Sequence, residues 1–172
     1  LRTVTGVQTC ALPIYWLHLE NSFSFVRGIF RQPIEGINNL PQIPAPRILT
    51  ELRAELLQNG KSIRDLSAYI ECDYTFRQNE AFLAYGTETS TGAYALWNAG
   101  FHASWVRAKK TICTFFLIAS NISDVTYQSH LSRLKYTAVN PISGRSGVFN
   151  MGRNFTVKLN FPFNFAHSRA SK

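Results

Sequence analysis

The sequence lacks any run of about 18 apolar residues, so no segment is long enough to cross a bilayer as a helix. Because only helices and closed barrels satisfy backbone polar groups in lipid, a β-barrel remains the only membrane-spanning option. Charged residues make up only 16% of the chain, and the formal charge of +8 is dispersed without a basic cluster. This distribution argues against nucleic acid as a partner, since nucleic-acid binding needs clustered Lys and Arg.

The sequence also lacks recognisable catalytic and metal-binding motifs. Cys72 and Cys113 lie singly within alternating segments and lack metal-ligand spacing, which favours a role as small apolar residues. The serines, histidines and carboxylates form no nucleophile arrangement, and no Gly-rich phosphate loop occurs. The sequence therefore predicts a chain that is not an enzyme and that carries no cofactor and no metal site.

What the sequence does contain is strict alternation of apolar and polar residues. In the stretch 154–165, NFTVKLNFPFNF, every second residue from Phe155 to Phe165 is apolar. Side chains of a strand point to opposite faces with period two, so one face is apolar and the other polar. A strand of about twelve residues, tilted by roughly 45°, crosses a hydrocarbon layer of about 30 Å. The pattern favours an outer-membrane β-barrel, with the apolar face toward lipid and the polar face toward the lumen.

Five further segments resemble this one, which gives about six strands in an antiparallel, all-β chain. They cover residues 15–27, 47–57, 66–76, 94–107 and 111–122, and the last of these is apolar on both faces, so its facing stays unassigned. Short turns near residues 58–65 and 108–110 alternate with long loops at 31–46, 77–93 and 123–153, as in bacterial barrels. The dipeptide Asn59-Gly60 marks one tight turn, while Pro33 and three further prolines oppose regular pairing in the first loop.

Three architectures fit this alternation. A soluble β-sandwich or a small closed barrel would bury the apolar face against a core, whereas a membrane barrel would expose it to lipid. Soluble strands usually span about five or six residues and these span about eleven or more, so the membrane barrel is favoured. Six strands cannot close a wide barrel, so we expect an open, curved, antiparallel sheet whose two edges are the strand from Tyr15 and the strand ending at Phe165.

The two ends of the chain are interpreted separately from residues 15–165. The stretch from Val4 to Ile14, VTGVQTCALPI, looks like translated sequencing adapter, and residues 1–14 are expected to be an artefact that packs poorly or adopts accidental structure. Residues 15–165 are interpreted as the informative part, a piece of a larger barrel. Residues 166–172, AHSRASK, break the alternation and are expected to be a disordered or read-through tail.

The ordered set of segments is similar to the C-terminal end of TonB-dependent outer-membrane receptors, across nearly all of residues 15–165. The segments that carry this resemblance are LENSFSFVRG (19–28), LPQIPAPRILTELRAEL (40–56), DYTFRQNEAFLAYGTET (73–89), YALWNAGFHASW (94–105), SNISDVTYQSHLSRLKY (120–136) and MGRNFTVKLNFPF (151–163). In that family an Asn-rich strand end leads through an aspartate to a tyrosine, as Asn121, Asp124 and Tyr127 do here.

The resemblance implies a barrel of 22 strands with a plugged lumen in the bacterial outer membrane, of which this chain would supply the last six. It implies import of a scarce nutrient such as an iron-siderophore chelate, haem or another metal complex, driven by the TonB complex acting on a plug that precedes this region. Outer-membrane lipid and the assembly machinery, which would recognise the terminal aromatic Phe165, are the other implied partners. A porin-like barrel without a plug and a soluble binding module remain the alternatives.

Candidate substrate-pathway residues are the charged and imidazole side chains on the polar face and in the longest loop. The carboxylates and guanidinium groups fit either a polar pathway or cross-strand pairs that brace the wall. Lone histidines are more often ordinary polar residues than ligands. The candidates are His18, Glu20, Arg47, Glu51, Arg53, Glu55, Glu71, Asp73 and His130.

Overall fold

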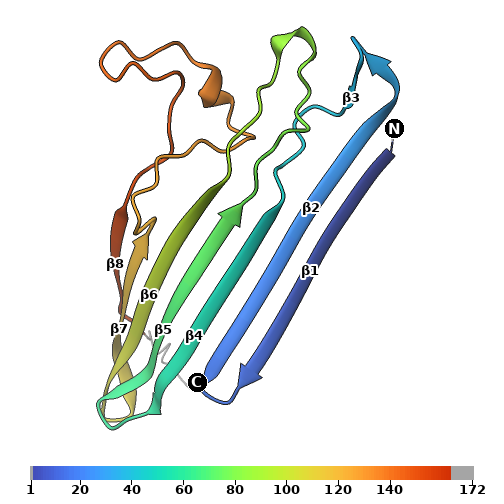
Figure 1. Ribbon diagram of the computed structural model, residues 1–172. Coiled ribbons are helices and arrows are strands. Elements are labelled where there is room, and N and C mark those ends of the chain that lie inside the picture. Colours follow the sequence, from blue (N-terminus) through green and yellow to red (C-terminus); the bar gives the residue numbers. More distant parts are fainter. Residues whose placement is uncertain (1, 164–172) are drawn as a thin grey trace, which may run out of the picture.

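The computed structural model describes residues 2–163 and shows one curved antiparallel sheet (Figure 1). The strands follow the order β1-β2-β4-β5-β6-β7-β8, and the short β3 pairs with β2. Each long strand is joined to its neighbour in sequence, so the sheet is a simple meander. The elements are β1 (Arg2–Ile14), β2 (Leu17–Ile34), β3 (Ile37–Asn39), β4 (Arg47–Asn59), β5 (Ile63–Thr75), η1 (Ala84–Gly86), β6 (Tyr94–Arg107), β7 (Lys110–Ser120), η2 (Arg133–Tyr136) and β8 (Asn154–Asn160).

The register gives the sheet two chemically different faces. Residues that are paired across antiparallel strands share a face, so one register row can be followed from strand to strand. One row is apolar from β2 to β8, and the row beside it, on the opposite face, is polar from β2 to β6. The apolar row is Leu19, Leu52, Ile70, Ala99, Ala119 and Phe155, and the polar row is Glu20, Glu51, Glu71 and Asn98.

The apolar face is uncovered in the part of the chain that the structure describes. Ile70 is 45% exposed and Leu159 is 54% exposed, whereas Ser67 and Ser104 on the polar face are each only 6% exposed. A soluble sandwich would bury the apolar rows against a second sheet, and the single sheet of residues 2–163 has none packed on them. The expectation of an open, curved, all-β antiparallel sheet is confirmed, and the sandwich alternative is wrong for this fold.

No helix among residues 2–163 combines the length and apolar character needed to span a membrane.

The connections alternate in length, as the sequence predicts. Three long connections lie at one end of the sheet and the short turns at the other (Figure 1). We call residues 35–46, 76–93 and 121–153 the first, second and third loops. The turn between β4 and β5 requires Gly60, because a Cβ there would lie 2.2 Å from the Ile63 carbonyl oxygen.

The first segment departs from expectation. Residues 2–14 form β1, which pairs with β2 in unbroken register from Arg2↔Ile29 to Ile14↔Leu17. The segment is therefore paired along its whole length, and the edges of the described sheet are β1 and β8, whereas the strand from Tyr15 was expected to be one of them. The expectation that residues 1–14 are not native stays a prediction. An open edge offers unpaired N–H and C=O groups that pair with any extended neighbour, so pairing does not test whether these residues are native.

The last strand is shorter than predicted. β8 contains seven residues and ends at Asn160, two residues before Pro162. Proline has no N–H to donate to the ladder, which explains why pairing with β7 stops there. Phe165 and residues 166–172 lie outside the described residues, so the predicted assembly signal and tail stay predictions.

The register assigns the facing of β7, which the sequence left open. In β7, Phe115 and Leu117 lie on the apolar face, whereas Phe116 and Ile118 lie on the polar face. β2 continues to Ile34, farther than predicted, but its register with β3 shifts between Ile29 and Ile34, where Pro33 lies. The prolines were predicted to oppose regular pairing, and the pairing of β2 with β3 is irregular around Pro33.

Candidate ligand-binding site

The strand residues predicted to line a pathway all lie on the polar face. Glu20, Glu51 and Glu71 follow one another in a single register row across β2, β4 and β5. Arg53 pairs with His18 in the next row on this face, and its Nη2 atom lies 2.7 Å from Glu51 Oε1. The structure therefore brings together, on one surface, residues up to about fifty positions apart in the sequence.

Many of these charges contact one another. Arg47 of β4 forms a bidentate pair with Asp73 of β5, with Nη2 2.6 Å from Oδ2. His18 Nε2 lies 3.5 Å from Glu55 Oε1, which joins β2 to β4. These contacts support the interpretation of cross-strand pairs that brace the wall.

A metal centre is not among the arrangements found. Within residues 2–163, no group of three or more His, Cys, Asp and Glu side chains is placed to hold a metal ion. Glu71 instead accepts a hydrogen bond from Asn98 Nδ2 at 2.7 Å. The same Asn98 accepts one from the backbone N–H of Asn121 at 2.9 Å, which ties the polar face to the third loop.

The start of the third loop is fixed by Asn121 and Asp124. Asn121 is 4% exposed, and its amide bridges the loop by donating to the Val125 carbonyl and accepting from the Val125 N–H, both at 2.9 Å. Asp124 Oδ1 accepts from the Arg153 N–H at 2.8 Å, which holds the two ends of the loop together. Both residues have positive φ, a conformation that Asn and Asp tolerate better than most residues.

The three loops are packed against one another. Gln78 of the second loop is 5% exposed and donates to the carbonyls of Ile43 and Pro44 in the first loop, at 3.1 and 3.2 Å. Glu88 of the second loop accepts hydrogen bonds from the N–H groups of Gln42 and Phe82. These bonds give the loops fixed positions relative to one another, as a preformed binding surface requires.

His130 lies inside this loop cluster, not on its surface. Its side chain is 3% exposed; Nδ1 lies 2.9 Å from Thr91 Oγ1, and Nε2 lies 3.9 Å from Glu88 Oε2. Burial lowers the pKa of His130, the nearby Lys135 ammonium lowers it further, and Glu88 opposes them. His130 is therefore a buried contact between the second and third loops.

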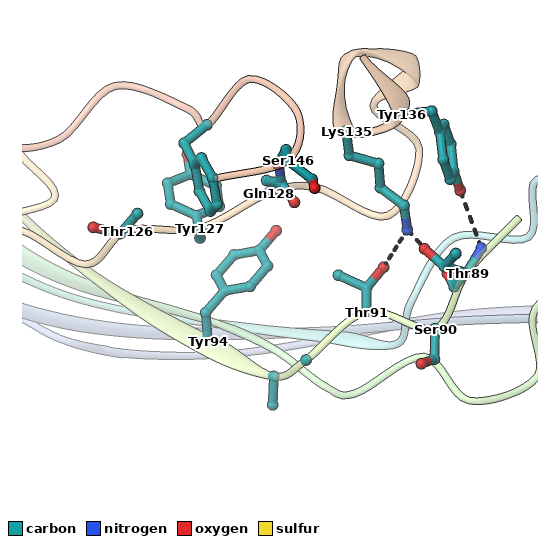
Figure 2. A pocket seen from close by; sticks show the side chains of 13 residues that line it. Thr89, Ser90, Thr91, Tyr94, Thr126, Tyr127, Gln128, Lys135, Tyr136 and Ser146 are labelled. Carbon is teal, nitrogen blue, oxygen red and sulfur yellow. Dashed lines mark hydrogen bonds between the residues drawn. The ribbon is translucent and has the colours of Figure 1, made fainter. Parts of the chain in front are cut away.

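An open pocket of about 420 Å³ lies between the second and third loops and the start of β6 (Figure 2). Tyr94 rises into it from β6, and its ring packs against Tyr127 of the third loop with centroids 4.5 Å apart. Lys135 reaches from η2 across to the second loop, where Nζ donates to the Thr89 carbonyl at 2.9 Å and to Thr91 Oγ1 at 2.8 Å. Burial raises the pKa of the Tyr127 phenol, with Tyr94 and Asp73 acting in the same direction, so this hydroxyl keeps its proton.

A second pocket of about 460 Å³ lies where all three loops meet. It is lined by Phe82, Glu88, His130, Arg133 and Tyr136, together with residues of the first loop. Both volumes fall in the range of small-molecule sites.

Sequence reasoning identified His130 but missed Tyr94, Lys135 and Glu88 as parts of a possible site. Residues such as Thr89 and Lys135 are 46 positions apart in the sequence, and no local pattern links them. Only the packing of the loops brings them together.

Comparison with known structures supports the barrel architecture. The chain is similar to a structure of the copper transporter OprC, with a TM-score of 0.74 over 94% of this chain and 16% sequence identity. At this identity the similarity establishes the fold alone: the open curved sheet has the fold of a section of a transmembrane β-barrel. The chain spans 24% of the length of that structure. No protein-family model matches the sequence, and no curated protein matches it in sequence.

Proposed function

We propose that this chain is the C-terminal part of the barrel of a TonB-dependent receptor that imports a scarce, metal-containing nutrient across the bacterial outer membrane. One observation carries the proposal: apolar rows of a long-stranded, curved sheet are left uncovered on one face, while a row of polar residues runs across the opposite face. That arrangement suits lipid on one side and water on the other. The similarity to a copper transporter is consistent with metal-linked transport.

The proposed cargo is an iron-siderophore chelate, haem or another metal complex. The loops supply two pockets of ligand size, and the polar face supplies a charged wall along the route through the lumen. The proposed partners are outer-membrane lipid, the assembly machinery, the nutrient, and the TonB complex acting through a plug encoded upstream. Catalysis has no part in this proposal.

Membrane insertion is tested by mixing the full-length protein with lipid vesicles and with buffer. A barrel section should enter the vesicles and require detergent for extraction. A monodisperse, detergent-free monomer would contradict the proposal.

A porin-like barrel is the second candidate, because the same sheet suits a channel without a plug. The reading frame upstream of this region separates the two. A plug and a TonB-contacting segment there support the receptor, and their absence supports the channel.

A further inference from the structure

The pocket between the second and third loops contains a buried cation without a carboxylate partner. Lys135 is 8% exposed, and none of the described acidic side chains lies within 4.0 Å of its ammonium nitrogen. Its two hydrogen-bond acceptors, the Thr89 carbonyl and Thr91 Oγ1, are neutral. A buried ammonium ordinarily needs a counter-charge, because removal from water disfavours the charged form.

The nearest buried carboxylate is already engaged elsewhere. Glu88 accepts from two backbone N–H groups, one on each oxygen, and its Oε2 also faces His130. Of the described residues that line the pocket, none is Asp, Glu, Arg or His, and Lys135 is the one that carries a charge. The Tyr136 ring, whose centroid lies 5.1 Å from Nζ, stabilises part of the Lys135 charge through a cation–π contact.

The ammonium has one donor left over. A Lys side chain carries three N–H donors, and two are used by Thr89 and Thr91. Tyr94 and Tyr127 also line the pocket, and no hydrogen bond of either phenol hydroxyl occurs within residues 2–163. Figure 2 shows Lys135 reaching down from the third loop to Thr89 and Thr91, while Tyr94 rises into the same pocket from the strand below, toward Gln128.

We propose that this pocket binds the carboxylate of an organic ligand through Lys135, with the tyrosine hydroxyls as further donors. Charge-assisted hydrogen bonds to a carboxylate would supply the missing counter-charge. The aromatic faces of Tyr127, Tyr136 and Phe149 provide contact for the body of the ligand, which favours an organic acid over a bare inorganic anion. The interpretation of this ligand as cargo, or as an acidic part of the cargo, rests on the proposed function. The binding of a carboxylate by the pocket does not.

The test uses 4-fluorobenzoate and its neutral analogue 4-fluorobenzamide as probes, with the full-length protein in detergent micelles. Fluorine NMR line broadening reports binding of each. We expect the benzoate to bind at least tenfold more tightly than the benzamide, and the difference to shrink as salt is added. Equal binding of the two probes, or tighter binding of inorganic phosphate than of the benzoate, would overturn the inference.

Lys135→Gln removes the charge while keeping an amide donor near Thr89 and Thr91. We expect it to abolish the preference for benzoate and to leave benzamide binding unchanged. Lys158→Gln is the matched control, because Lys158 lies in β8 over the Phe116 ring, outside the pocket, and carries the same charge. If Lys158→Gln weakens benzoate binding equally, the effect is general electrostatics and the site is refuted.

Because Lys135→Gln also alters the contact between the loops, Tyr94→Phe provides a second variant. It removes one hydroxyl that has no partner within the described residues, and should weaken benzoate binding several-fold without loosening the loops. Unchanged binding in Tyr94→Phe together with unchanged binding in Lys135→Gln would overturn the inference. Preference for benzoate by a protein that fails to enter vesicles would instead refute the proposed function and leave the pocket standing.

Discussion

Charge placed on the apolar face should be far more destabilising than the same charge placed on the polar face. Leu117 and Ile118 are adjacent in β7, yet they point to opposite sides of the sheet. Leu117 pairs with Phe101 and Val157 on the apolar face, and Ile118 pairs with Gly100 and Thr156 on the polar face. Leu117→Arg and Ile118→Arg therefore introduce the same group at the same height.

The magnitude follows from where each side chain lies. Leu117 is 40% exposed on the uncovered face, so an arginine there would enter the hydrocarbon near its middle, at a cost of about 2–4 kcal/mol. An arginine at residue 118 would meet the water and polar groups of the lumen side, and should cost about 1 kcal/mol in lost packing. The expected difference is about 1–3 kcal/mol, or roughly a factor of 5 to 150 in the folding equilibrium.

The assay is reversible urea unfolding of each variant in phosphatidylcholine vesicles, with the heat-modifiable mobility of the folded barrel as the readout. The same comparison in a soluble protein would give the opposite result, because an exposed leucine tolerates arginine and a packed isoleucine does not. Equal costs, or a greater cost for Ile118→Arg, would refute the assignment of the apolar face to lipid.

Three further predictions concern local contacts. Gly100→Ala should cost about 1–3 kcal/mol in urea unfolding, because its Cβ would lie 2.2 Å from the Tyr69 ring, and Tyr69→Ala in the same chain should relieve most of that cost. Asn121→Ala should cost about 2 kcal/mol, since it leaves buried backbone groups unpaired at positive φ, and Asn121→Gly should give a similar loss if hydrogen bonds rather than φ dominate. The pKa of His130 is lower in the folded state than in the unfolded state. Its contribution to the free energy of unfolding is therefore constant above the unfolded pKa of about 6.5, and it declines as the pH falls through that value toward the folded pKa. Proteolysis of the loops should therefore quicken from pH 7.5 to 5, and His130→Gln should remove that dependence.

The sheet could be predicted from the sequence to the extent that its strands alternate. The predicted segment 94–107 coincides with β6, although its apolar and polar residues alternate only from Trp97 to Trp105. The facing of β7 could not be assigned, because Phe116 and Ile118 are apolar residues on the polar face. Their place becomes clear only from the partners of β7: Phe116 stacks against His102, with centroids 5.7 Å apart.

The ends of the sheet were harder to predict, for two different reasons. β1 forms through backbone hydrogen bonds to the edge of β2, and such pairing depends little on side chains. β8 has the predicted alternation, but Pro162 ends pairing early and outweighs the apolar pattern beyond it.

The candidate site was the least predictable part. The polar-face residues, such as Glu51 and Glu71, follow from alternation, and their common face is confirmed by the register. The contacts of Lys135 with Thr89 and Thr91 join loops that have no periodic pattern, so nothing in the sequence marks them.

The hydrogen bonds from Gln78 to the first loop and from Lys135 to the second have a practical consequence for exchanging loops between proteins that share this sheet. A chimera that replaces one loop would leave the buried partners in the other two facing foreign residues. The three loops, residues 35–46, 76–93 and 121–153, should therefore be transferred together. Chimeras built one loop at a time would report misfolding where they were designed to report selectivity.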